Sequence, residues 1–211
     1  LFEISQIPYV GCGVLASSTG MDKLICKTIY SEIGLPQVSY CSTNRWTFRK
    51  NQEEELNEIE DKLNYPIFVK PANLGSSVGI SKATNREELL AGINEALIYD
   101  SRIVLEQGID AREIEVAVLG NEEVKASIAG EIKPAKDFYD YEDKYINGAS
   151  TYDIPAKISE ADMEKIRTMA IKAFKSLDGK GLSRVDFFID KNSGEIFINE
   201  INTLPGFTNI S

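Results

Sequence analysis

The sequence predicts an α+β protein with mostly antiparallel sheets, arranged in two lobes. Short segments alternate apolar and polar residues, as in Ile114, Val116 and Val118, and turn residues separate them, which is typical of half-buried strands. Amphipathic helices with recognisable capping residues lie between these strands. We place the change from one lobe to the other near residues 100 to 106.

The first half of the chain contains most of the predicted helices. We expect helices at 2–7, 21–33, 51–63 and 86–98, a strand or turn at 8–11, and strands at 38–41, 65–70, 78–82 and 103–106. Four positions of the second helix recur at helical spacing and are expected to face a core: Leu24, Ile25, Thr28 and Ile29. Gly34 and Pro36 end this helix. Asn85 caps the helix at 86–98, because its side chain can accept a hydrogen bond from the first turn.

The second half is dominated by strands. We predict strands at 112–119, a strand pair within 121–132, a hairpin of 184–190 with 196–202, and a loop over 134–155. One long helix at 159–177 separates the loop from the hairpin. Ser159 is its expected cap, with Asp162 at the third helical position.

Composition limits the kinds of ligand and location. The 211 residues are 43% hydrophobic and 27% charged, enough for one sizeable core or two small ones. The net charge of −10 argues against nucleic acid or an anionic membrane as a partner. No apolar run reaches 18 residues, so no segment is predicted to span a membrane. Three widely spaced cysteines form no disulfide or metal pattern, and we expect a cytoplasmic protein.

The chain contains no histidine, which excludes several chemistries for these 211 residues. Ser-His and Cys-His nucleophilic catalysis and histidine-ligated zinc all require this residue. Any acid–base chemistry within this chain would depend on carboxylates, lysine or tyrosine.

The hairpin near the C-terminus carries the first candidate site. A two- or four-residue loop would place Asp186 opposite Asn199, whereas a three- or five-residue loop, with Gly194 at positive φ, would place Asp186 opposite Glu200. We predict the odd loop, because Asn202 then shares the face of both carboxylates. Carboxylate and amide oxygens suit Mg²⁺ and its bound phosphates. A solvated hairpin face is the alternative.

A Gly/Ser-rich loop after the strand at 65–70 is the second candidate. It has the sequence Lys70-Pro71-Ala72-Asn73-Leu74-Gly75-Ser76-Ser77-Val78-Gly79. It is not a Walker A loop, because no lysine follows its last glycine and no helix follows the loop. Its backbone N–H groups and hydroxyls could close over phosphates. An ordinary hairpin is the alternative.

Taken together and in this order, these motifs closely resemble the ATP-grasp part of the D-alanine–D-alanine ligase family. The matching segments are Met21-Asp22-Lys23, YPIFVKPANLGSSVGISK, VLEQGIDAREIEVAVLG, FYDYEDKY, GLSRVDFFID and INEINTLPGFTNIS. The resemblance covers nearly the whole chain. It implies an ATP-grasp fold in which two α+β lobes hold ATP. It also implies domains at 1–20 (the tail of an N-terminal domain), 21–105 (the central lobe) and 106–211 (the C-terminal lobe).

The resemblance assigns cofactor and metal roles position by position. Lys23, Lys70 and Ser77 are expected to contact the phosphates of ATP. The implied adenine and ribose pocket is lined by Glu106, Ile109, Glu113 and Phe138. The implied ligands of two Mg²⁺ ions, which Mn²⁺ could replace, are Asp186, Glu200 and Asn202. Gly108 stands where many relatives carry an aromatic residue, so this chain departs from the pattern there.

The resemblance further implies the reaction. The carboxylate of one D-alanine attacks the γ-phosphate of ATP, and the amine of a second D-alanine attacks the resulting acyl phosphate, giving the dipeptide used for peptidoglycan. The implied catalytic residues are Ser76 and Ser211 for the two substrates, Lys144 and Tyr145 in a closing loop, and Arg184 for the tetrahedral oxyanion. A Lys-Tyr pair in this loop goes with D-alanine as the second substrate.

Further expectations concern the whole protein and the alternatives to this function. We expect the chain to be a piece of a longer protein, and we expect the piece to lack the N-terminal domain. Relatives are commonly dimers, so a homodimer is a further expectation. Ligases that use D-lactate or D-serine as the second substrate remain alternatives. A Mg-ATP-binding module without catalysis is the alternative from another functional class.

Overall fold

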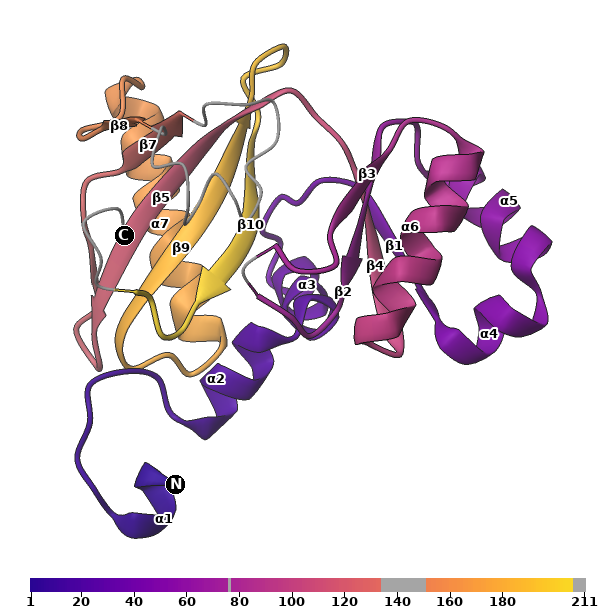
Figure 1. Ribbon diagram of the computed structural model, residues 1–211. Helices are drawn as coiled ribbons and strands as arrows, with labels where there is room; N and C mark the ends of the chain where they lie inside the picture. Colours follow the sequence, from indigo (N-terminus) through magenta and orange to yellow (C-terminus); the bar gives the residue numbers. More distant parts are fainter. Residues whose placement is uncertain (76, 134–150, 207–211) are drawn as a thin grey trace. The chain divides into compact units, whose positions relative to one another are not determined.

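The contacts in the computed structural model divide the chain into two compact units, and the model describes residues 1–75, 77–133 and 151–206 (Figure 1). Unit 1 comprises Leu1–Met21, Ile25–Gln37 and Ala111–Ser211, and unit 2 comprises Asp22–Leu24 and Val38–Asp110. The predicted boundaries at 20/21 and 105/106 therefore differ from the contact boundaries. The first boundary differs because residues 25–37 place Cys26, Tyr30 and Leu35 in the core of unit 1.

Unit 2 is a four-stranded antiparallel sheet with helices packed against it. The strand order is β1 (Tyr40–Asn44), β4 (Arg102–Gln107), β2 (Ile67–Pro71) and β3 (Ser81–Ala83). Its helices are α4 (Arg45–Lys50), α5 (Gln52–Lys62) and α6 (Arg86–Tyr99). α6 packs on β2, β3 and β4, and its buried Leu89 and Ile93 join Ile67 and Val69 in one core.

Unit 1 is built on a six-stranded antiparallel sheet. The strand order is β10 (Ile196–Asn202), β9 (Gly181–Asp190), β5 (Ala111–Gly120), β7 (Gly130–Lys133) and β8 (Thr151–Asp153), and β6 (Lys125–Ala126) also pairs with β5. Its helices are α1 (Phe2–Ser5), α2 (Val14–Met21), most of α3 (Lys23–Glu32) and α7 (Glu160–Ser176). α7 covers one face of β5, β9 and β10 (Figure 1), where Val116, Val185 and Phe174 are buried.

Both predicted helix caps are present. The Asn85 side chain accepts a hydrogen bond from the Glu88 N–H at 3.0 Å, and the Ser159 hydroxyl accepts one from the Asp162 N–H at 3.1 Å. Each cap satisfies a backbone donor that the first helical turn cannot use. The starts of α6 and α7 are therefore confirmed.

Two helices were not predicted from the sequence, and two other elements differ from their predictions. α2 has no apolar periodicity and only Ala16 is buried, while α4 is a single short segment capped by Asn44. α3 buries Cys26, Lys27 and Tyr30 instead of the predicted face, and Ile25 is exposed. β3 begins after the predicted position because residues 77–79 turn.

The turn at 77–79 results from the backbone conformation of two residues. Ser77 and Gly79 have φ values of 58° and 69°, in the left-handed region that an extended strand does not use. A Cβ on Gly79 would lie 2.6 Å from the ring of Tyr99. The chain therefore needs glycine there and enters β3 only at Ser81. Among the helices of the described ranges, none is long and apolar enough to cross a bilayer.

Candidate functional site

The turn between β9 and β10 differs from the prediction. Ile189 pairs with Ile196, and the Asp190 N–H donates to the Glu195 carbonyl at 2.9 Å. Four residues, 191–194, therefore form the loop, and the predicted odd loop is wrong. Gly194 does have the expected positive φ, at 73°. Such an even loop alone would leave Asp186 opposite the wrong residue.

A β-bulge then restores the predicted pairing. Phe187 lies opposite Ile198, but the next pair is Asp186 with Glu200, so Asn199 is an extra residue in β10. The bulge moves the rest of β10 by one position relative to β9. The predicted opposition of Asp186 and Glu200 is confirmed, although its cause is the bulge and not the loop.

The sequence contained a signal for this bulge. Ile196 and Ile198 are buried and two residues apart, as in a regular strand, but the next buried residue, Ile201, is three further on. A strand that keeps one face towards the core can change parity only through an extra residue. The apolar spacing of β10 therefore predicts a bulge between Ile198 and Ile201.

Four side chains converge on the face of the sheet opposite α7. The Arg184 guanidinium donates from Nε to Asp186 Oδ1 and from Nη2 to Asp186 Oδ2, both at 2.7 Å. The Asn202 amide donates to Asp186 Oδ2 at 2.9 Å. Glu115, opposite Asp186 on β5, approaches Arg184 Nε at 3.2 Å. Asp186 is thus the centre of a cluster of hydrogen bonds, and the ion pair of Arg184 with Glu115 extends the cluster to a third strand.

Arg184 remains charged in this cluster. Burial alone would lower the pKa of its guanidinium, but the hydrogen bonds and charge of Asp186 raise the pKa well above its ordinary value, and Glu115 and Glu200 add to the rise. Arg184 is therefore a fixed cation among three carboxylates. A charged guanidinium can donate to an oxyanion without first taking up a proton.

The donor set fits Mg²⁺ by type and by strand position. Asp186 and Glu200 face each other, and Asn202 follows two residues along the same face. Within the described ranges, no three His, Cys, Asp or Glu side chains gather into a metal-binding group, so the set depends on the amide oxygen of Asn202. Both oxygens of Asp186 accept hydrogen bonds from Arg184, and a cation at Asp186 would compete with them.

Unit 2 holds the predicted phosphate lysines. Lys70 Nζ lies 2.5 Å from a carboxylate oxygen of Glu106, and both side chains are largely buried. Lys23 donates from Nζ to the Leu74 carbonyl, and its own N–H donates to the Ala72 carbonyl at 2.9 Å. Lys23 therefore contacts the backbone of the Gly/Ser loop, and Lys70, the first residue of that loop, pairs with Glu106 of β4. Glu106, predicted for the nucleotide base and ribose, neutralises Lys70.

Gly108 lies close to the backbone of a neighbouring segment. Its N–H donates to the Pro66 carbonyl at 2.8 Å. A Cβ added to Gly108 would lie 2.7 Å from that carbonyl oxygen and 3.2 Å from the ring of Phe68. This chain has no room for an aromatic side chain at position 108 in the present backbone arrangement, because the Pro66 and Phe68 side chains also lie within 3.2 Å of the added Cβ.

The other predicted residues are divided between the units. Ser77 and the half-buried Ile109 belong to unit 2, whereas Glu113 lies on β5 in unit 1, on the same face as Glu115. Five predicted residues lie outside the described ranges: Ser76, Phe138, Lys144, Tyr145 and Ser211. Their roles stay predictions.

Glu115 and Tyr30 are not among the residues that the sequence predicts for the site. Glu115 follows Glu113 at strand spacing on the polar face of β5, a signal present in the alternation of that strand. Tyr30 is fully buried, and its pKa is raised well above 10 by burial first, then by Cys26 and the charges of Glu200 and Asp186. The aromatic ring of Tyr30 therefore lies in the core within electrostatic reach of the carboxylate pair.

Comparison with known proteins identifies the family. A family model described as "D-ala D-ala ligase C-terminus" matches residues 29–211. This chain belongs to the D-alanine–D-alanine ligase family. The D-alanine–D-alanine ligase of Heliobacterium modesticaldum is 58% identical over all 211 residues, and that of Bacillus cytotoxicus is 53% identical. The chain spans 58% of the length of each of these two relatives.

Solved structures of ligases of this family share the fold. The D-Ala:D-Ser ligase VanG from Enterococcus faecalis superimposes with a TM-score of 0.85 at 37% identity, over 98% of this chain and 59% of that structure. The D-alanine–D-alanine ligase from Coxiella burnetii gives 0.81 at 34% identity, over 99% of this chain and 54% of the structure. The predicted ATP-grasp class, α+β with antiparallel sheets, is confirmed.

Proposed function

We propose that a protein carrying this chain joins two D-alanine molecules at the expense of ATP. The observation that carries the proposal is the placement of Asp186 opposite Glu200 with Asn202 and Arg184 on the same face, in a chain of this ligase family. Two relatives that are 58% and 53% identical are both named D-alanine–D-alanine ligases, which favours alanine over lactate or serine as second substrate.

The reaction has two steps, and neither of them requires a nucleophile from the protein. The carboxylate oxygen of the first D-alanine attacks the γ-phosphorus of ATP, and the bond to ADP breaks, giving an acyl phosphate. The amine of the second D-alanine then attacks the acyl carbon, phosphate leaves, and the amine loses a proton. The chain has no histidine, and this chemistry does not require one. Positioning and charge stabilisation are the work left to the protein.

Unit 1 would supply the groups around the transferred phosphoryl group. Asp186, Glu200 and Asn202 would hold the Mg²⁺ ions, which offset negative charge on the phosphates. Arg184, already charged, would donate to the oxyanion formed when the second amine attacks. Its place on the same strand face as Asp186, two residues away, supports this role.

Unit 2 would bind the nucleotide. Lys70 and Lys23 are its phosphate-binding lysines, and Glu106 and Ile109 would line the base and ribose pocket. The Lys70–Glu106 ion pair supports the assignment, because it holds a lysine in a defined position at the start of the Gly/Ser loop. The family resemblance assigns a ribose contact to Glu113 and a phosphate contact to Ser77.

A phosphate-release assay on the full-length protein tests the proposal. We expect release that depends on D-alanine, ATP and Mg²⁺, and product analysis with D-alanine, D-serine and D-lactate together should return the alanyl-alanine dipeptide. Glu200→Gln should abolish release while circular dichroism stays unchanged. Near-normal turnover by Glu200→Gln would overturn the metal assignment, and binding of Mg-ATP without any release would favour a non-catalytic module.

A further inference from the structure

Arg184 has two carboxylate partners, and they lie on different strands. Asp186, on its own strand, receives two hydrogen bonds of 2.7 Å. Glu115, on β5, lies 3.2 Å from Arg184 Nε, the same nitrogen that donates to Asp186 Oδ1. The side chains of all three residues are mostly buried. The Nε–H therefore donates to Asp186, and Nε also lies within ion-pair distance of Glu115.

The order of the strands separates the two partners. In the sequence β10, β9, β5, the residues Glu200, Asp186 and Glu115 form one row across the sheet. Glu200 is on the β10 side of Asp186, and Glu115 is on the β5 side. A cation held by the Asp186–Glu200 pair would take up the carboxylate oxygens to which Arg184 now donates. Glu115 is outside that pair and lies within ion-pair distance of Arg184 Nε.

We propose that Glu115 is a positioning residue for Arg184, holding its Nε–H when Asp186 binds metal. A guanidinium has five N–H donors in one rigid plane, so fixing Nε fixes the direction of the four remaining N–H groups. Held at one edge by Glu115, Arg184 keeps its Nη groups for an oxyanion of the reaction. This inference rests on the proposed function, because that function gives Asp186 its metal and Arg184 its oxyanion.

Kinetics on the full-length protein provides the first test. Glu115→Gln keeps the size of the side chain and removes its charge. We expect kcat to fall by about 10- to 100-fold, the usual effect of a misplaced catalytic group, with the KM for ATP unchanged. Glu115→Asp keeps the charge and should recover part of kcat. Glu123→Gln, an exposed carboxylate in the turn after β5, is the matched control and should behave as the unaltered protein.

NMR of the Arg184 Nε–H group provides a second readout that does not need turnover. Arg184→Lys lacks this group and assigns its signal. With Mg-ADP bound, the Arg184 signal should persist in the unaltered protein and in Glu123→Gln, and should broaden or move to the solvent-exposed position in Glu115→Gln. An Arg184 signal that is the same in Glu115→Gln as in the unaltered protein would overturn the proposal. An unchanged kcat would also overturn it.

The two proposals can fail separately. If the unaltered protein ligates no amino acids, the proposed function fails, while the dependence of the Arg184 signal on Glu115 still decides whether Glu115 orients the guanidinium. If ligation occurs and both Glu115 variants turn over normally, the positioning role fails alone. If Glu115→Gln does not fold, Glu115→Asp replaces it in the NMR experiment. A shift of the Arg184 Nε–H signal in that variant then supports the positioning role, and an unshifted signal overturns it.

Discussion

Gly108 shows at the residue scale how local packing overrides a family pattern. The resemblance places an aromatic residue at this position in many relatives, yet here a backbone carbonyl lies where a side chain would begin. The close approach of Pro66 and the contact with Phe68 are possible only because position 108 has no Cβ. The residue that a family usually carries at one position therefore cannot be assigned to another chain without considering the packing around that position.

Replacing Gly108 with alanine should destabilise unit 2. The new Cβ would lie 2.7 Å from the Pro66 carbonyl oxygen, and backbone cannot yield as a flexible side chain can. Overpacking of this kind costs about 1–3 kcal/mol. Urea denaturation measures the change. Gly75→Ala is the control, because no atom lies within 4 Å of its added Cβ, and it should stay within about 0.5 kcal/mol. Equal stability of both variants would contradict the packing argument.

At the scale of elements, strand β10 shows how a single extra residue decides which side chains meet. Without the bulge at Asn199, the four-residue turn would place Asn199 opposite Asp186 and turn Glu200 towards the other face. The bulge also keeps Ile201 in the core. One irregularity therefore serves both the packing of the sheet and the pairing of the two carboxylates.

Deleting Asn199 should be tolerated, whereas deleting Phe197 should not. Removal of the extra residue leaves Ile198 opposite Phe187 and Glu200 opposite Asp186 in a regular ladder. Removal of Phe197 turns the buried Ile198 to the polar face, which costs roughly 1.5–3 kcal/mol of burial. Thermal unfolding of the two deletion variants compares them. A similar loss of stability in both would show that the bulge itself is required.

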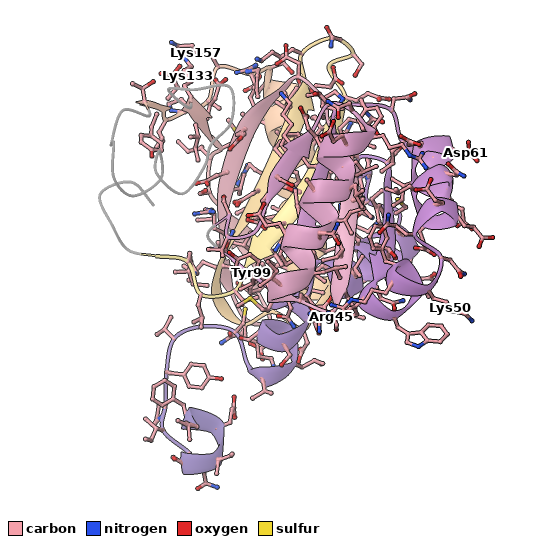
Figure 2. The ribbon with its side chains drawn as sticks, turned by 45° about the vertical axis from the view of Figure 1, so that its right-hand side comes forward. Arg45, Lys50, Asp61, Tyr99, Lys133 and Lys157 are labelled. Atoms are coloured by element: carbon pink, nitrogen blue, oxygen red, sulfur yellow. The ribbon has the colours of Figure 1, made fainter. Side chains whose placement is uncertain are left out.

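The pairing of β5 with β7 is reinforced by charge. Arg112 donates to both oxygens of the buried Glu131, at 2.8 and 2.7 Å. Nearby, Lys133 and Lys157 both pair with Asp153, at 2.8 and 3.1 Å, and the two lysines lie close together in Figure 2. The hydrogen bonds of Arg112 lower the pKa of Glu131 below its ordinary 4.5, although burial acts the other way.

The Glu131 pair predicts an acid-dependent loss of stability. Because the folded-state pKa is lowered, the stabilisation is complete above about pH 4.5 and is lost as the pH falls through the folded pKa. Glu131→Gln should cost about 1–3 kcal/mol at pH 7, since Arg112 would lose its buried partner. Its stability should also fall less steeply below pH 4.5. Urea midpoints from pH 7 to pH 3 measure this, with the exposed Glu122→Gln as control; parallel curves would refute the prediction.

At the scale of the whole molecule, the described residues form two cores with no residue in common. Unit 1 gathers Phe174, Ile166 and Phe187 around its sheet, and unit 2 gathers Ile93 and Leu89 around its own. The two cores correspond to two sheets, and no strand of the described ranges belongs to both. Each core is therefore expected to set the local stability of its own unit.

Core mutations should act within one unit. Ile93→Ala removes a fully buried side chain from unit 2 and should cost about 2–5 kcal/mol, and Phe174→Ala should cost about 3–5 kcal/mol in unit 1. Amide hydrogen exchange followed by peptide is the measurement. Ile93→Ala should raise exchange in 38–110 and leave β5 and β9 protected, with the converse for Phe174→Ala. Equal loss across both units would indicate one cooperative structure.

The sequence determined most elements of this protein and the family to which it belongs. Local rules sufficed for the caps of α6 and α7, for most strands, and for the chemical type of the hairpin residues, because periodicity and capping depend on neighbours in the chain. Local rules failed for α2, which has no apolar pattern, and for α3, whose buried face is chosen by the core of unit 1.

Only the tertiary structure decided how the hairpin residues meet. The loop between β9 and β10 has an even number of residues. The pairing of Asp186 with Glu200 comes from the bulge that keeps Ile201 buried. The partnership of Arg184 with Glu115 depends on the pairing of β5 with β9, strands about 70 residues apart in the chain (positions 115 and 184). Contacts of this kind follow from the register between strands, and register is fixed by the packing of a whole sheet face.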